Sequence, residues 1–134
     1  MTIEREFAAD DAVLEEIIAL TEGELEKVDC PMKIMVQISI AVEEIFVNIA
    51  HYAYPDGNGT MTYKLETDTS SVKITFIDAG IPFDPLSKPD PDISLSADER
   101  PIGGLGIYMV KKSMDDVRYA NVDGKNILTI CKNF

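Results

Sequence analysis

Apolar and polar residues follow two different periods along the chain, and these periods predict its elements. Alternation over residues 2–7 predicts a first strand, since side chains two positions apart share one face of a sheet. Apolar residues three and four apart then predict two helices, from about Asp10 to Lys27 and from Pro31 to just before Tyr54. Strands are predicted over 60–66, 72–77, 117–121 and 126–132, and a third helix over about 104–114. This order predicts one α/β sandwich over residues 1–134, with the helices on one face of the sheet.

The segment from 78 to 106 has no regular period and contains five of the seven prolines. A stretch of this length without secondary structure is usually a functional loop or lid in a compact domain. We therefore expect a lid over about 83–103.

The net charge of the chain limits the classes of partner that it is expected to bind. The 24 acidic residues against 12 basic ones give a formal net charge of −12. Such a chain is repelled by phosphate backbones and anionic lipid, so direct nucleic-acid and membrane partners are not expected. No apolar run approaches the ~20 residues of a membrane span, and the first residues do not resemble a secretory signal. We expect a cytoplasmic protein whose two cysteines, Cys30 and Cys131, are free thiols.

The second helix carries a polar pair beside its apolar stripe. A spacing of four residues places Glu44 and Asn48 on one helix face, whereas Glu43 points away. Asn48 could hold a divalent metal through its side-chain oxygen while Glu44 orients or deprotonates a nucleophile. The alternative is a solvated pair on a helix edge.

A second candidate feature follows the strand predicted over 72–77. Asp78 ends an apolar strand, where a carboxylate is costly unless it is hydrogen-bonded. The amino group of adenine is a suitable donor, and Gly80 would let the backbone pass close to the ring. The alternative is an ordinary exit from a strand into a turn, where Asp and Gly are common.

A third feature is the glycine-rich stretch that opens the third helix, Gly103-Gly104-Leu105-Gly106. Glycines at a helix start let a polyphosphate approach unpaired backbone N–H groups at the positive end of the dipole. The stretch is neither a P-loop nor a dinucleotide fingerprint, because it lacks the Gly-Lys-Ser/Thr ending and does not follow a strand.

In this order and at these separations, the three features resemble the Bergerat-fold (GHKL) ATP-binding superfamily, and most closely the bacterial anti-sigma-factor serine/threonine kinases. The family's N-box residues fall on Glu44 and Asn48, and its adenine-contacting residues on Asp78 and Gly80. Its lid glycines fall on Gly104 and Gly106. The resemblance implies an α/β (α+β) two-layer sandwich with a mixed sheet and an order of βααββ, lid, αββ.

The resemblance also implies a function. The chain would bind ATP and Mg²⁺ and phosphorylate a serine or threonine of a small anti-anti-sigma partner, in alternation with binding a sigma factor. Glu44 would be the catalytic base, and Asn48 the Mg²⁺ ligand. The cofactor-binding residues would be Asn48, Asp78, Gly80, Arg100, Gly104, Leu105, Gly106 and Thr129. A homodimer is the assembly that the superfamily suggests.

The sequence departs from the family at two of these positions. Family kinases often place an arginine just before the lid glycines, whereas here Pro101-Ile102-Gly103 separates Arg100 from Gly104. A threonine often follows the glycine of the last hairpin. Here Lys125 and Asn126 follow that glycine, and the nearest threonine is Thr129.

Two questions remain open: whether the chain transfers phosphate at all, and what His51 does. A nucleotide-binding regulatory module that sequesters a partner without transferring phosphate would use Asp78 and the glycines but would not need Glu44. His51, the only histidine, lies one turn after Asn48. It is either a phosphoacceptor or a packed or phosphate-adjacent residue.

Overall fold

The computed structural model describes residues 1–87 and 106–134 in full and, at Leu105, the backbone alone. The predicted elements are present in the predicted order. The strands are β1 Thr2–Ala8, β2 Thr60–Thr67, β3 Ser71–Asp78, β4 Asp116–Val122 and β5 Lys125–Asn133. The α-helices are α1 Leu14–Lys27, α2 Met32–Asn48 and α3 Leu105–Ser113, with shorter helical turns at Asp11–Val13, Ile49–Ala53 and Pro85–Ser87.

The described strands form one sheet in the order β1-β2-β3-β5-β4. Every described pair is antiparallel, so the expectation of a mixed sheet is wrong in this respect. After β3 the chain returns through α3 to β4, which runs in the same direction as β3. The hairpin partner β5 then occupies the position between them and runs opposite to both.

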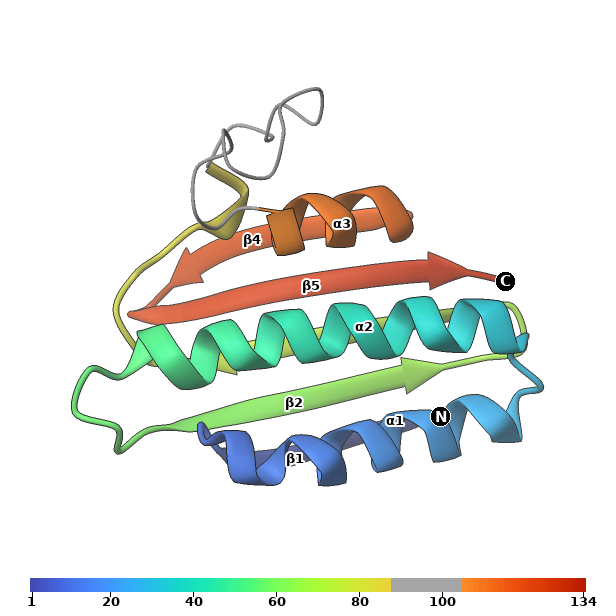
Figure 1. The fold of residues 1–134 in the computed structure, drawn as a ribbon, viewed down its shortest axis with the longest axis horizontal. Helices are drawn as coiled ribbons and strands as arrows, with labels where there is room; N and C mark the ends of the chain where they lie inside the picture. The colour runs from blue at the N-terminus through green and yellow to red at the C-terminus, as the bar shows by residue number, and fades with distance from the viewer. Residues whose placement is uncertain (88–104) are drawn as a thin grey trace.

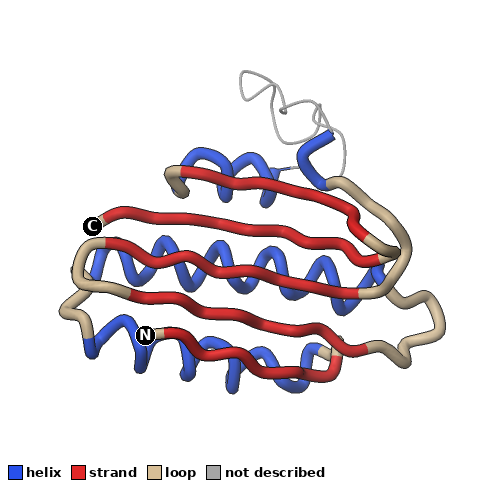
Figure 2. The backbone as a smooth tube through the Cα atoms, turned by 180° about the vertical axis from the view of Figure 1, so that it is seen from behind, coloured by secondary structure: helices blue, strands red, loops and turns tan. Residues whose placement is uncertain are grey.

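The α-helices cover one face of the sheet, as the sequence predicts. In Figure 1, α2 lies across the middle of the sheet with α1 and α3 on either side. In Figure 2, seen from behind, the described strands lie in front of the helices. The buried apolar residues on the covered face include Ile38, Ile45, Phe46, Met61, Leu65, Ile74, Phe76 and Ile130. This two-layer α+β arrangement confirms the predicted fold class.

Local chemistry explains where the elements begin and turn. The Asp10 side chain accepts a hydrogen bond from the backbone N–H of Ala12 at 2.9 Å and caps the helical turn before α1. Between β4 and β5, Asp123 and Gly124 have φ angles of 53° and 79°. Positive φ at both central residues is typical of the tight turns that join adjacent antiparallel strands.

The core contains one buried pair of hydroxyl groups between α1 and the sheet. The Thr21 Oγ1 and Tyr63 hydroxyl oxygens lie 2.6 Å apart, and both side chains are fully buried. Burial raises the pKa of Tyr63 far above its ordinary value, so this phenol stays neutral. The pair therefore links α1 to β2 without a buried charge.

The helical segment Met32–Ala53 is long and apolar enough to cross a membrane by length and composition alone. It has 22 residues, and its most apolar window has a mean hydropathy of 1.4. Lys33, Glu43, Glu44 and His51 interrupt the apolar run in the sequence. In the fold, six residues of α2 pack into the core, so a core helix explains the same composition: Met35, Ile38, Ala41, Val42, Ile45 and Phe46.

Candidate functional site

A cavity of about 580 Å³ lies where the end of α2, the loop after β3, the start of α3 and strands β4 and β5 meet. Its volume is in the range of sites that bind small molecules. Four of the predicted site residues line it: Glu44, Asn48, Asp78 and Gly106. The fold therefore brings together residues that are up to 62 positions apart in the sequence, from 44 to 106.

Glu44 and Asn48 form a hydrogen-bonded pair at one part of the cavity. The Asn48 Nδ2 donates to Glu44 Oε1 at 3.2 Å, and both side chains are partly buried. This bond uses the nitrogen of the amide, so the Oδ1 of Asn48 is the atom that can face a cation. Glu43 is exposed and lines a different groove, between α1 and α2.

Gly106 brings the first turn of α3 against Glu44. A Cβ atom at this position would lie only 2.0 Å from Glu44 Oε1, so no larger residue fits without displacing the carboxylate. The amino end of α3 is thus held next to the Glu44–Asn48 pair. The amino end of a helix favours anions, because its first N–H groups lack partners within the helix.

Four other predictions for this part of the chain are not addressed by the structure. Arg100 and Gly104 lie outside the described residues, as does most of the lid predicted over 83–103. Leu105 begins α3, and only its backbone is described.

Asp78 lies at the end of β3 with 6% of its surface exposed. Its Oδ1 accepts hydrogen bonds from the Gly80 N–H and from Asn126 Nδ2, each at 2.9 Å. These bonds offset part of the cost of burying the carboxylate. Among the described contacts, both donors bind the same oxygen, so Oδ2 is left for a ligand.

The structure gives Gly80 a different reason from the predicted one. A Cβ at Gly80 would lie 2.2 Å from the backbone oxygen of Ala53, and the next residue, Ile81, donates its N–H to that same oxygen at 2.8 Å. Gly80 is therefore needed where the loop after β3 crosses the end of the helix. Close approach of Gly80 to a bound ring stays a prediction.

The prediction for Thr129 is wrong in its placement. Successive residues of a strand face opposite sides of the sheet. Asn126 and Leu128 face the helices and line the cavity, so Thr129 faces the uncovered side. Asn126 takes the place that was assigned to Thr129. The sequence indicates the inward position of Asn126, because residues 126, 128 and 130 of a strand share one face and Leu128 and Ile130 are apolar.

The remaining walls of the cavity are mostly apolar, and no motif in the sequence predicts them. They come from the helical turn after α2, the loop after β3, and β4 and β5: Ile49, Ala53, Ile81, Phe83, Tyr119 and Leu128. Apolar walls with one buried carboxylate suit a flat heterocycle that carries an amino group. The start of α3 and the Glu44–Asn48 pair suit an anionic, metal-binding tail.

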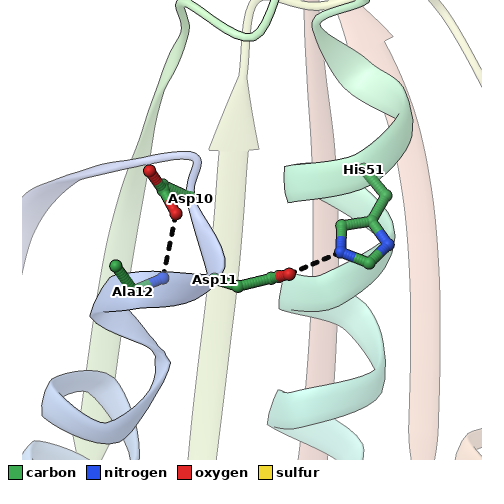
Figure 3. Close-up of polar contacts among 4 residues, drawn as sticks. All are labelled: Asp10, Asp11, Ala12 and His51. Carbon is green, nitrogen blue, oxygen red and sulfur yellow. Dashed lines mark hydrogen bonds and ion pairs between the residues drawn. The ribbon is translucent and has the colours of Figure 1, made fainter.

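His51 lies apart from this cavity. Its Nε2 is 2.6 Å from Asp11 Oδ2, and both side chains are about half exposed (Figure 3). The pair joins the helical turn after α2 to the residues that precede α1. His51 does not line the cavity, so the structure gives no support to a phosphate-adjacent role, and its exposed ion pair leaves the phosphoacceptor role untested.

Both cysteines are free thiols, as predicted, and burial raises the pKa of each. Thiols whose pKa is raised are poor nucleophiles at neutral pH.

Comparison with known proteins shows the family of this chain. The family described as the histidine kinase-like ATPase domain matches residues 7–132. The chain belongs to this family. Among its relatives are the serine-protein kinases RsbW of Bacillus cereus (strain B4264) and of Bacillus anthracis. Each is 30% identical over 95 residues, which cover 68% of this chain and 59% of the relative.

A solved structure shows the same fold. The RsbU and RsbW domains of Rv1364c from Mycobacterium tuberculosis match 98% of this chain and 32% of that chain, with a TM-score of 0.70 and 14% identity. Together with the RsbW relatives, this match confirms the resemblance to the anti-sigma-factor kinases of the GHKL superfamily. The histidine kinase-like ATPase domain spans less than two thirds of the RsbW proteins that it matches, so their activity and partners are not transferred by the match alone.

Proposed function

We propose that this histidine kinase-like ATPase domain binds ATP with Mg²⁺ in the cavity and transfers the γ-phosphoryl group to a protein serine or threonine. One observation carries the proposal. A strand-end carboxylate, a glutamate–asparagine pair and the amino end of a helix converge on one cavity from three separate parts of the sequence. The kinase name of the RsbW relatives supports the same reaction.

Asp78 would recognise the adenine ring. Its free Oδ2 can accept a hydrogen bond from the exocyclic amine, whereas guanine presents a carbonyl oxygen at that position. Two opposed acceptors in a buried site cost on the order of 1–3 kcal/mol. The apolar walls would hold the two faces of the ring.

Asn48 would hold Mg²⁺ through Oδ1, since Nδ2 is bonded to Glu44. In the described part of the chain no group of three or more His, Cys, Asp or Glu residues could hold a metal. This fits Mg²⁺, which takes few protein ligands and completes its shell with water and nucleotide phosphates. When bound, Mg²⁺ neutralises negative charge on the phosphates during transfer.

Glu44 would act as the general base. It accepts the proton of the partner's hydroxyl while the hydroxyl oxygen bonds to the γ-phosphorus, and the bond to the β,γ-bridging oxygen breaks to leave ADP. Gly106 would keep the Glu44 carboxylate next to the helix end where the phosphates lie.

The resemblance supplies the proposed partners. The phosphorylated protein would be a small anti-anti-sigma factor. In alternation with this reaction, the domain would bind a sigma factor in the cytoplasm. A homodimer is part of this proposal. The acidic character of the chain supports protein partners over nucleic acid or an anionic membrane.

The test is transfer of label from γ-labelled ATP, with Mg²⁺, to a small protein in a lysate of the source organism. Glu44→Gln keeps the shape of the side chain but removes the base, so transfer should fall by about 10²–10⁴-fold while ATP still binds. Glu43→Gln is the matched control, because Glu43 is exposed and outside the cavity. Equal, full transfer by both variants excludes Glu44 as the base. ATP binding without transfer by the wild type would instead favour a regulatory module.

A further inference from the structure

Asn126 is the most connected polar side chain at the cavity, and its own surface is 6% exposed. Its Nδ2 donates to Asp78 Oδ1 at 2.9 Å and to the backbone oxygen of Ile81 at 3.0 Å. Its Oδ1 accepts from the Tyr119 hydroxyl and from Asn121 Nδ2 at 3.2 Å. The side chain thus joins β3, the loop that follows it, and the β4–β5 hairpin.

These contacts fix the orientation of the amide. The backbone N–H of Phe83 also points at Asn126 Oδ1, at 3.4 Å. Rotating the amide by half a turn would place Oδ1 against the Asp78 carboxylate and Nδ2 against the donors of Asn121 and Phe83. A buried amide whose donors and acceptor are all engaged has one stable orientation.

The fixed amide also fixes Asp78. Both hydrogen bonds to Asp78 reach Oδ1, one from Asn126 and one from the Gly80 backbone. A carboxylate held at one oxygen presents the other oxygen in one direction. Asp78 lines the cavity, so the remaining oxygen is the one available to a ligand there.

We propose that Asn126 is a positioning residue that aims Asp78 Oδ2 at the exocyclic amine of a 6-aminopurine nucleotide. This rests on the proposed ATP site and adds the residue that sets its base selectivity. Asn126 acts through Asp78 and through the loop from Gly80 to Phe83. A serine or threonine has a single hydroxyl proton, so it could donate to only one of Asp78 and Ile81.

The experiment measures how much the exocyclic amine contributes to affinity. Dissociation constants are determined for ATP and for purine riboside triphosphate, which lacks the 6-amino group, by isothermal titration calorimetry. For the wild type, loss of the amine should weaken binding about ten-fold or more, because a hydrogen bond to a charged group is lost. For Asn126→Ala this ratio should fall to about three-fold or less, because Asp78 is no longer aimed.

Asn126→Leu provides a second variant of similar size. It removes the donor to Asp78 without placing a second carboxylate beside it, so the ratio should fall in the same way. Asn133→Ala is the matched control. Asn133 lies on the same strand and is exposed, and it neither contacts Asn126 nor lines the cavity, so the wild-type ratio should persist.

A purely structural role for Asn126 would weaken both nucleotides equally and leave the ratio at its wild-type value. That result in both folded variants, checked by circular dichroism and thermal melting, overturns the proposal while leaving the ATP site intact. Failure of the wild-type chain to bind ATP overturns the proposed function and this proposal together.

Discussion

Replacement of Gly106 by alanine should affect the stability of the domain and its proposed phosphotransfer to different extents. A Cβ at this position would lie 2.0 Å from Glu44 Oε1, whereas ordinary van der Waals contact begins at 3.4 Å. The carboxylate must therefore move by about 1.4 Å, which is possible because it is the far end of a flexible side chain. The movement breaks its 3.2 Å hydrogen bond with Asn48.

The expected outcome combines a small structural effect with a large functional one. Alanine is favoured over glycine within a helix by up to about 1 kcal/mol, so the melting temperature should change by only a few degrees. A misplacement of about 1 Å in a catalytic group can cost about 10²-fold, so phosphotransfer should fall by that order. Thermal melting and the labelled-ATP assay measure the two effects on one sample.

The same variant can refute the reasoning in two ways. Full phosphotransfer by Gly106→Ala would mean that the position of the Glu44 carboxylate does not matter for the reaction. A collapse of thermal stability would mean that Glu44 cannot move aside and that Gly106 serves the packing of α3. Either result removes the argument that glycine is needed here for chemistry.

Two further predictions concern the stability of the fold, one beside the cavity and one at the turn between β2 and β3. Gly80→Ala should destabilise the domain by about 1–3 kcal/mol in urea unfolding, because its Cβ would meet the Ala53 backbone, which cannot rotate away; unchanged stability would contradict the close approach. Hydrogen bonds from Ser70 and Ser71 lower the pKa of Asp68. The charged carboxylate therefore adds stability above its unfolded pKa of about 3.9, and this contribution is lost as the pH falls through the lower folded value. Unfolding of wild type and Asp68→Asn should differ at pH 7 and converge in acid; a constant difference would contradict the assignment.

Patterns that depend on local periodicity predict this fold well. The apolar stripe of α2 is buried where its spacing indicates, and the alternation of β2 and β5 assigns their inner faces correctly. Glu44 and Asn48 are neighbours because a helix brings residues four apart together, whatever the rest of the chain does.

Features that depend on tertiary contacts were predicted less well. The insertion of β5 between β3 and β4 sets the antiparallel pairing, and no local pattern encodes it. The need for glycine at position 80 arises from Ala53, which lies on a different element. The Thr129 assignment followed distance along the chain from Gly124, although strand alternation favours Asn126. Strand alternation indicates the face of Asn126, but it does not indicate its contacts, because its partners lie as many as 48 residues away.

The position of β5 in the sheet also bears on how the chain folds. During synthesis β3 emerges before β4 and β5, yet its neighbour on that side is the last strand of the sheet to be made. Until then β3 has an unpaired edge, and β4 has no strand beside it. Such non-local pairing slows folding and leaves strand edges open to association with other chains. Asn126 and Leu128 lie on this late strand, so the cavity lacks this wall until β5 has left the ribosome.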